Sequence, residues 1–382
     1  MLPVIWLIVG GTGGLGQNSA SARLPLDKKL SLCYIFYNMS LSKESMVYQI
    51  DFFDAIYTKE FYDNIIPQMG DYFHTHREKE LIFNFVDLNF ISPSIVPNIL
   101  NIADIYKKYT DGKTISLKLS WNPKLLSYLY SIHFFDYSNT LNLFNFNREM
   151  LGGFEAYSTE ENCNLIFSEV NSTEDEILKK VENLMRSMAI YKKFEKDSKD
   201  DYEKLSEIFF HLIHNANDIE RGNSNAYGLF QINKYKDNTI AYISICDSGK
   251  GIPYTITKKF QNNEATPYFI SNKNTSTFYY DLEALFWRKR IHSFPFRHGL
   301  YNVAQMVLRK GGKIGIHSDD MYVLFPHFFQ NTFDSITDRI VQKIDLEPDL
   351  QYSLSAFARR NTMTRKYRGV HIDIEIPIGE KK

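Results

Sequence analysis

The sequence predicts an α+β protein in which a smaller α/β domain, about residues 46–150, precedes a larger one, about residues 160–382. Strand-like runs alternate with amphipathic segments in both regions, which is typical of α/β layers. A chain of 382 residues is also long enough for two hydrophobic cores. Residues 151–200 would connect the two domains through a strand and a helix.

Composition and charge argue against several classes of protein. The net charge of −1 gives no global basic field, so we expect no nucleic-acid partner. No apolar run reaches the ~18 residues that a membrane span requires, so we expect no membrane partner. The three cysteines, Cys33, Cys163 and Cys246, are too few and too scattered for a disulfide framework or a zinc site. A reducing cytoplasm is therefore the expected location.

Residues 1–45 form an N-terminal extension to which the sequence gives no clear role. Gly11-Thr-Gly13-Gly-Leu-Gly16 follows a strand-like run and matches the GxGxxG pattern of dinucleotide sites. No amphipathic helix follows Gly16, however, and Pro25 would break one. We therefore interpret this segment as an irregular extension rather than as a nicotinamide-cofactor site.

The first domain has a buried strand, residues 80–86, which ends at Asp87. Ser92-Pro93-Ser94 would then open a helix, with Ser92 or Ser94 as its cap and Pro93 in its first turn. Apolar spacing predicts the rest of the domain: this helix through Ile95, Ile99, Ile102 and Tyr106, a strand at 115–119, and a helix through Leu125, Leu126, Leu129 and Ile132 that ends near 134–136.

This order of elements resembles the STAS domain, the fold of the anti-sigma-factor antagonists. Residues 85–94 lie where that family carries a phosphorylatable Asp-Ser-Ser-Gly loop. The resemblance implies that this domain contacts a protein partner and makes Ser94 the candidate phosphoacceptor. Pro93 and Ile95 depart from the family's loop, and a simple helix cap is the alternative role for Ser94.

Two helices are predicted early in the second domain, over residues 174–191 and about 202–221. The second has an apolar stripe and, at 100° per residue, a separate polar face that is either solvated or lines a pocket. The stripe contains Leu205, Ile208, Phe209, Leu212, Ala216 and Ile219, and the polar face contains Glu207, His211, His214, Asn215 and Asp218.

A strand over residues 239–246 leads to Asp247 and then to Ser248-Gly249-Lys250-Gly251-Ile252. A carboxylate at this position could accept a hydrogen bond from a ligand. The glycines would let the backbone turn sharply and approach that ligand closely. Cys246 would point to the opposite face of the strand, into a core.

The connection over about 253–298 is long enough to carry function, and we interpret it as a lid with a helix at 281–289. Gly299 then opens a helix, whose free N–H groups and positive dipole end suit phosphate. Basic side chains available to phosphates are Arg288, Lys289, Arg290, Arg297 and His298, of which the last two border the glycine turn.

That helix continues through Leu300, Val303, Ala304, Val307 and Leu308, and strands at 313–317, 321–325 and 370–376 follow. The last of these alternates apolar and polar residues, as a half-buried antiparallel strand does. An insertion over about 326–368 carries Arg359, Arg360, Arg365, Lys366 and Arg368. These residues are either a contact surface or a solvated basic loop.

An Asn within a helix, then Asp-x-Gly-x-Gly, then a glycine-opened helix resemble the GHKL (histidine-kinase-like, Bergerat-fold) ATPases. The resemblance covers about residues 160–382. It implies a Bergerat-type α/β sandwich, a mixed sheet covered by helices on one face. It also implies ATP and Mg²⁺ as cofactors, with Asn215 as the Mg²⁺ ligand. Nucleotide contacts would come from Asn215, Asp218, Asp247, Gly249, Gly251, Ile252, Arg297, His298, Gly299 and Leu300.

Two positions depart from the family's pattern. His211 stands where the family has the Glu that activates the attacking water, so His211, or Glu207 one turn earlier, would be the base. Val370 follows Gly369 where the family has a Thr that holds a water against the adenine.

The two resemblances together predict a cytoplasmic Mg-ATP-binding regulatory protein. It would hydrolyse ATP slowly or use nucleotide occupancy to control a protein partner. A serine/threonine kinase of the anti-sigma-factor type and a non-catalytic nucleotide-binding scaffold remain alternatives. ATP or ADP, a protein partner of the STAS-like domain and a second copy of the chain are the expected partners.

Overall fold

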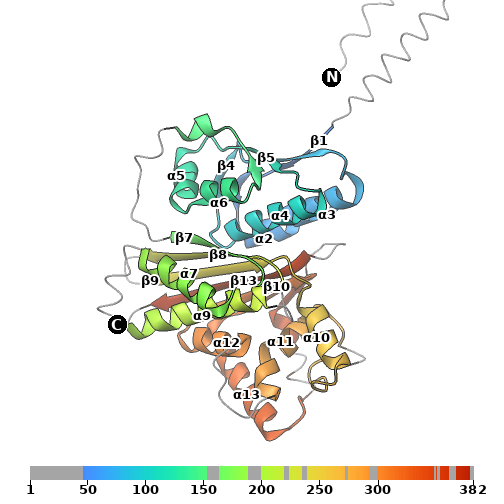
Figure 1. The fold of residues 1–382 in the computed structure, drawn as a ribbon. Coiled ribbons are helices and arrows are strands. Elements are labelled where there is room, and N and C mark those ends of the chain that lie inside the picture. The colour runs from blue at the N-terminus through green and yellow to red at the C-terminus, as the bar shows by residue number, and fades with distance from the viewer. Residues whose placement is uncertain are drawn as a thin grey trace, which may run out of the picture. The chain divides into compact units, whose positions relative to one another are not determined.

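The computed structural model describes residues 46–152, 163–187, 199–218, 223–234, 239–271, 274–291, 299–347, 350, 353–360 and 367–378. The chain divides into two units, residues 1–46 and 47–382, and all elements discussed here belong to the second. The glycine motif at 11–16 lies outside the described residues. The fold of the second unit is mixed α/β, with two main sheets (Figure 1).

Residues 47–151 form an α/β layer whose sheet is parallel, in the order β1-β3-β5-β6. Its strands are β1 (Val47–Asp51), β3 (Glu80–Asn84), β5 (Ile115–Lys118) and β6 (Phe144–Asn145), and a second parallel pair is β2 (Asp54–Ile56) with β4 (Leu88–Ile91). Its helical segments are α2 (Thr58–Glu60), the π-helix η2 (Phe61–Ile65), α3 (Ile66–Thr75), α4 (Val96–Tyr109), α5 (Pro123–Ser131), α6 (Phe134–Thr140) and the 3-10 turn η3 (Arg148–Leu151).

The predicted cap of α4 is wrong. The helix begins at Val96, its N-cap is Ile95 without a side-chain capping bond, and its first turn contains Pro97 rather than Pro93. The Ser94 hydroxyl instead lies 2.9 Å from the Ser92 hydroxyl and 3.1 Å from the hydroxyl of Thr58. The two serine side chains are therefore part of a hydroxyl cluster before the helix.

Residues 163–378 build a seven-stranded sheet in the order β12-β11-β10-β13-β9-β8-β7. Every neighbouring pair is antiparallel, so the expectation of a mixed sheet is wrong. Directly joined strands, such as β8 with β9, can pair only in this sense. The strands are β7 (Cys163–Ser168), β8 (Ala226–Lys234), β9 (Thr239–Asp247), β10 (Lys313–Asp319), β11 (Met321–Phe325), β12 (Ala358–Arg360) and β13 (Tyr367–Ile378).

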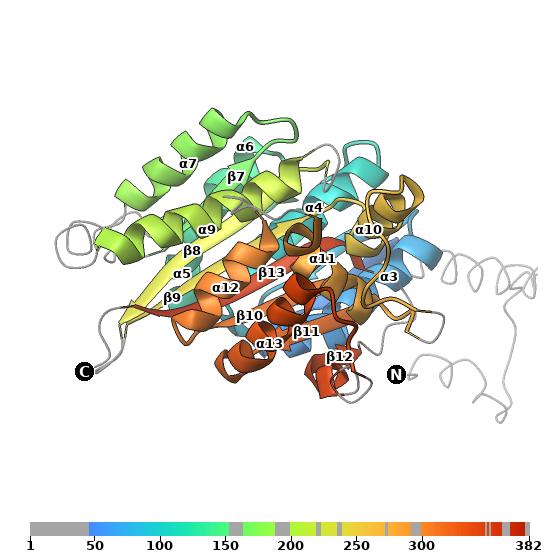
Figure 2. The ribbon, with the colours of Figure 1, turned by 90° about the horizontal axis from the view of Figure 1, so that it is seen from below.

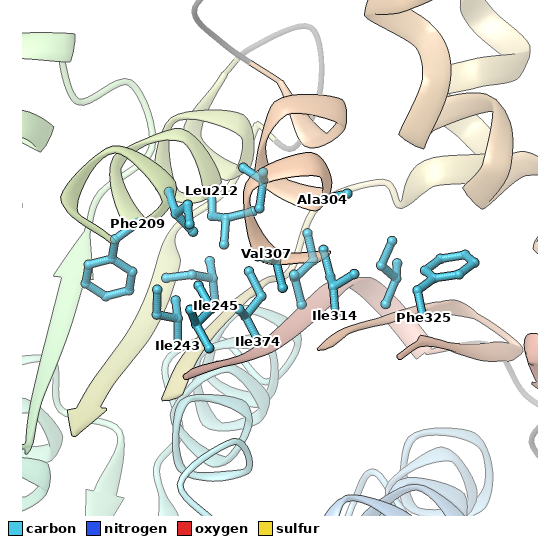
Figure 3. Packing of buried hydrophobic residues seen from close by; sticks show 14 of the residues in the cluster. Phe209, Leu212, Ile243, Ile245, Ala304, Val307, Ile314, Phe325 and Ile374 are labelled. Carbon is cyan, nitrogen blue, oxygen red and sulfur yellow. The ribbon is translucent and has the colours of Figure 1, made fainter. Parts of the chain in front are cut away.

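Helices cover one face of this sheet, and α9 and α12 lie side by side on it (Figure 2). Phe209 and Leu212 of α9 and Val307 of α12 pack over Ile245 and Ile374, as Figure 3 shows, and all five are buried. The predicted apolar stripes of these helices are thus confirmed for their described residues. The helices are α7 (Glu174–Ser187), α9 (Lys199–Asn217), α10 (Ile252–Gln261), α11 (Thr277–Ile291), α12 (Leu300–Arg309) and α13 (Gln330–Gln342).

The segments interpreted as a lid and as an insertion both contribute to the core. Phe278 and Leu282 of α11, and Phe333 and Ile336 of α13, are buried in the same hydrophobic cluster as the sheet. The lid interpretation missed α10. It also missed the length of α11, because a helix buried on several sides lacks the two-faced pattern that identifies an amphipathic helix.

Helix α4 lies between the two sheets and is buried from Val96 to Tyr106 (Figure 1). The hydrophobic core that contains α4 also includes Leu229 and Cys246 of the seven-stranded sheet. These two residues lie on the face of the sheet opposite to α9 and α12. The prediction that Cys246 faces a core is confirmed. None of the described helices is both long and apolar enough to cross a membrane.

Candidate nucleotide site

Asp247 is the last residue of β9 and pairs with Ala226, the first residue of β8. Successive side chains of a strand point to opposite faces. Because Cys246 faces the N-terminal layer, the Asp247 side chain points to the helical face. It is only 6% exposed, as expected for a group at the base of a site rather than on a surface.

The side chain and the backbone carbonyl of Asp247 both accept hydrogen bonds. The Gly249 N–H donates to Oδ1 at 2.8 Å, and the side-chain amide of Asn101 on α4 donates to the Asp247 carbonyl at 2.9 Å. Burial raises the pKa of Asp247 to about 7, against the lowering effect of the Gly249 and Val370 N–H groups. The carboxyl group would therefore gain from a ligand that donates a hydrogen bond to it.

Two glycines make the turn at Asp247 possible. Gly251 is the N-cap of α10 with φ +79°. Gly369 has φ +99°, and a Cβ there would lie 1.8 Å from the Asp247 carbonyl oxygen. The Ile252 N–H donates to the Ser318 hydroxyl at 3.2 Å, which fixes the start of α10 to the end of β10.

The last turn of α9, which carries Asn215, lies at the same edge of the sheet as Asp247. The Ser224 N–H donates to the Ala216 carbonyl at 3.3 Å, and two residues later Ala226 pairs with Asp247. Asn215 and Asp218 are partly buried. Asn215 lies on α9, but Asp218 follows it, since the helix ends at Asn217 and not near residue 221 as predicted.

Asn217 is a residue of this region that the sequence analysis missed. Its side-chain amide donates to the Ser224 carbonyl at 2.9 Å and to the Ser168 carbonyl at 3.3 Å. It thereby ties the end of α9 to β7 and to the turn before β8. A polar residue on the buried side of an otherwise apolar helix was the available signal.

The side chains of the predicted polar face of α9 do not all point toward the same neighbours. His211 Nε2 lies 3.3 Å from Glu207 Oε1, with the histidine 2% and the glutamate 46% exposed. His214 lies 3.2 Å from Glu174 at the start of α7, so it faces that helix rather than the site. The two candidate bases, His211 and Glu207, thus form a pair in which only the glutamate is open to solvent.

Gly299 is the buried N-cap of α12, with φ +141°. A short turn joins the end of α12 to β10, so α12 runs back along β10. Gly299 and Leu300 therefore lie toward the edge of the sheet that holds Ser318 and Asp247. The adjacent Arg297 and His298 lie outside the described residues.

Arg290, one of the basic side chains offered for phosphate, has a structural role instead. It pairs with Glu283 and donates to the Thr266 carbonyl. Glu283 in turn accepts the N–H groups of Tyr268 and Phe269. The side chains of Arg288 and Lys289 lie outside the described ones.

Other features do not coincide with these residues. A hollow of about 570 Å³ runs along α13, lined mainly by exposed side chains, and holds none of the predicted site residues. Among the residues described, no three His, Cys, Asp or Glu side chains gather as a metal site. No family model matches the chain, and no curated protein matches it.

Proposed function

We propose that the chain binds an adenine nucleotide as Mg-ATP, in the manner of a Bergerat-type domain, between α9, the Asp247 turn and the start of α12. The observation that carries the proposal is Asp247 itself. Its carboxyl group is buried at the end of a central strand, faces the helical layer and has a pKa raised by burial to about 7. Such perturbed groups cluster at functional sites.

The remaining residues fit the parts of a nucleotide. Asp247 would accept the adenine amino group, while Gly249 and Gly251 let the backbone approach the base. The Gly299 end of α12 would hold phosphate through its free N–H groups. Asn215 would bind Mg²⁺ with a neutral oxygen, since this ion keeps most of its ligands as water and phosphate oxygens.

The pairing of His211 with Glu207 favours slow ATP hydrolysis, or control of a partner by nucleotide occupancy, over rapid turnover. His211 is buried where the resemblance expects an accessible Glu, and its partner Glu207 lies one turn away. A base must reach the water that it activates, directly or through one further water. The same burial supports the alternative of a nucleotide-binding scaffold without turnover.

Phosphate transfer to Ser94 of the same chain is not favoured by the geometry. The Ser94 carbonyl accepts a hydrogen bond from Ser244 at 2.9 Å. Ser244 shares the face of β9 that Cys246 occupies, opposite to the Asp247 side chain. A kinase of the anti-sigma-factor type would therefore need an acceptor other than Ser94.

Calorimetric titration of Mg-ATP into the purified chain tests the proposal. Asn215→Ala and Asp247→Ala should each weaken binding about tenfold or more, because each removes a contact to a charged or buried group. Asn331→Ala, on the exposed surface of α13, is the matched control and should bind as the unaltered chain does. No binding by the unaltered chain, or equal binding by all variants, would contradict the proposal.

A further inference from the structure

A second cavity, of about 170 Å³, lies between the N-terminal layer and the seven-stranded sheet. Thr58, Ser92 and Ser94 line it from the N-terminal layer, and Ser244 lines it from β9. Ser244 and Asp247 are an odd number of residues apart on β9, so their side chains point to opposite faces of the sheet. The cavity and the candidate nucleotide site are therefore separated by the sheet.

Three hydroxyl groups form a row along one wall of this cavity. The middle one, Ser94 Oγ, lies 3.1 Å from Thr58 Oγ1 and 2.9 Å from Ser92 Oγ. Each hydroxyl has one O–H donor and two lone pairs that accept. The two hydrogen bonds within the row use two of its three donors, which leaves one O–H without an acceptor among the described residues. The row can therefore both donate to a ligand and accept from it.

The wall of hydroxyl groups is accessible from outside the protein. Thr58, Ser92 and Ser94 are all partly exposed. Tyr57 also lines the cavity and is 54% exposed, so it borders the opening. Its ring packs on that of Phe90, with 5.3 Å between the two ring centroids. An aromatic ring in this place offers a flat apolar face to the C–H groups of a ligand.

The charges around the cavity do not favour an ionic ligand. None of the described residues that line it is basic, so nothing there attracts an anion. Of its two acidic residues, Glu375 pairs with Lys313 at 2.7 Å. The carboxylate of Asp373 lies against Gly315 and Tyr322, which do not line the cavity. A neutral ligand with several hydroxyl groups suits these surroundings best.

We propose that this cavity binds a neutral cyclic polyol, the class of the monosaccharides and the inositols. Its hydroxyl groups would exchange hydrogen bonds with the row of Thr58, Ser94 and Ser92, and the C–H groups of its ring would pack on Tyr57. A few placed polar groups beside aromatic and apolar side chains are typical of small-molecule sites. The volume of about 170 Å³ has room for about six groups of water size. The inference is independent of nucleotide binding on the other face.

The test is a saturation-transfer NMR titration of the whole chain at pH 7.5 with three probes: myo-inositol, glucose and cyclohexanol. At least one of the two polyols should give a signal that saturates with concentration, and the stronger of them distinguishes an inositol from a hexose. Cyclohexanol has the ring but only one hydroxyl group, and it should give no saturable signal over the same concentrations.

Removal of a hydroxyl group from the row tests the polar contacts. Thr58→Val should weaken polyol binding about three- to tenfold, because it removes a neutral hydrogen-bonding group of similar shape. Thr75→Val, at an exposed position on α3, is the matched control and should bind as the unaltered chain does. Ser92→Ala removes the other end of the row and serves as a second variant if Thr58→Val does not fold.

Replacement of Tyr57 tests the packing of the ligand's ring. Tyr57→Phe keeps the aromatic face and should bind the polyol as the unaltered chain does, whereas Tyr57→Ala should lose most of the signal. No saturable signal from either polyol, an equal signal from cyclohexanol, or equal polyol affinities of Thr58→Val and Thr75→Val would overturn the proposal.

Discussion

Burial makes the carboxyl group of Asp247 a weaker acid in the folded chain than in the unfolded one. Its pKa rises from 3.8 to about 7 in the folded chain. Since the folded state then holds the proton more tightly, this group's contribution to stability is present below about pH 4 and is lost as the pH rises through about 7. A ligand that donates to the ionised carboxylate would offset that loss.

Nucleotide affinity should therefore increase with pH. If binding requires the ionised carboxylate, affinity at pH 8 should exceed that at pH 6 by about tenfold, given a pKa near 7. Calorimetry of Mg-ATP across this range measures the change. Asp247→Asn is the control, because its remaining pH dependence reports the titration of the nucleotide itself. Parallel profiles for the two proteins would show that Asp247 does not contact the ligand.

Gly369 should resist replacement more than another glycine of similar backbone conformation. Gly369 and Gly112 have φ +99° and +91°, but only the Gly369 Cβ would collide, at 1.8 Å from the Asp247 carbonyl. Gly369→Ala should cost about 2 kcal/mol more stability than Gly112→Ala in urea unfolding. Equal costs for the two variants would mean that the close approach is easily relieved.

Helix α4 joins the N-terminal layer to the proposed nucleotide turn. Its Asn101 donates to the Asp247 carbonyl, and its Lys108 lies 3.4 Å from the Ser248 hydroxyl. Arg368, from the start of β13, donates to the Ser248 carbonyl at 3.2 Å and lies over the ring of Tyr109 at the end of α4. The turn is thus held by α4 and by the start of β13, both of which are distant from it in the sequence.

Loss of Asn101 should affect stability and nucleotide affinity together. Asn101→Ala removes a buried hydrogen bond, worth about 1–3 kcal/mol, and releases the Asp247 carbonyl. Asn98→Ala is the matched control, since that buried amide donates to the nearby Ser94 carbonyl instead. Only Asn101→Ala should weaken Mg-ATP binding in calorimetry. Equal affinities for the two variants would remove α4 from the account of the site.

The elements differ in how far the sequence could predict them. The stripes of α9 and α12 and the position of Asp247 follow local patterns and were predictable. Asn101 was not, because its partner lies 146 residues away. The cap of α4 was misassigned because the Ser92 and Ser94 hydroxyls bond each other and Thr58, a choice that depends on the tertiary fold.

At the scale of the whole second unit, a buried polar chain connects the two layers. Tyr62 of η2 bonds His371 Nδ1, and His371 Nε2 lies 3.0 Å from the Ser244 hydroxyl. The Tyr62 ring also stacks on the His317 ring, with 3.7 Å between the two ring centroids. Burial lowers the pKa of His371 to about 3, so this histidine is neutral in the folded chain.

Acid should weaken the contact between the layers. The folded pKa of His371 lies below its unfolded value of 6.5, so its contribution is present above pH 6.5 and is lost as the pH falls. From pH 6.5 to 5 this amounts to about 2 kcal/mol. Urea unfolding at both pH values measures it, and His371→Gln should lack this part of the decrease. An unchanged decrease in the variant would assign it to other groups.

The place of β13 in the sheet has a consequence for synthesis on the ribosome. Residues 367–378 lie between β9 and β10, so a growing chain cannot close its sheet until this last strand has emerged. Until then, strands β7 to β9 and β10 to β12 would be separate hairpin groups with unpaired inner edges, which are prone to aggregate. Nascent chains stalled before Tyr367 should therefore be sensitive to protease and should need a chaperone, whereas completed chains should not.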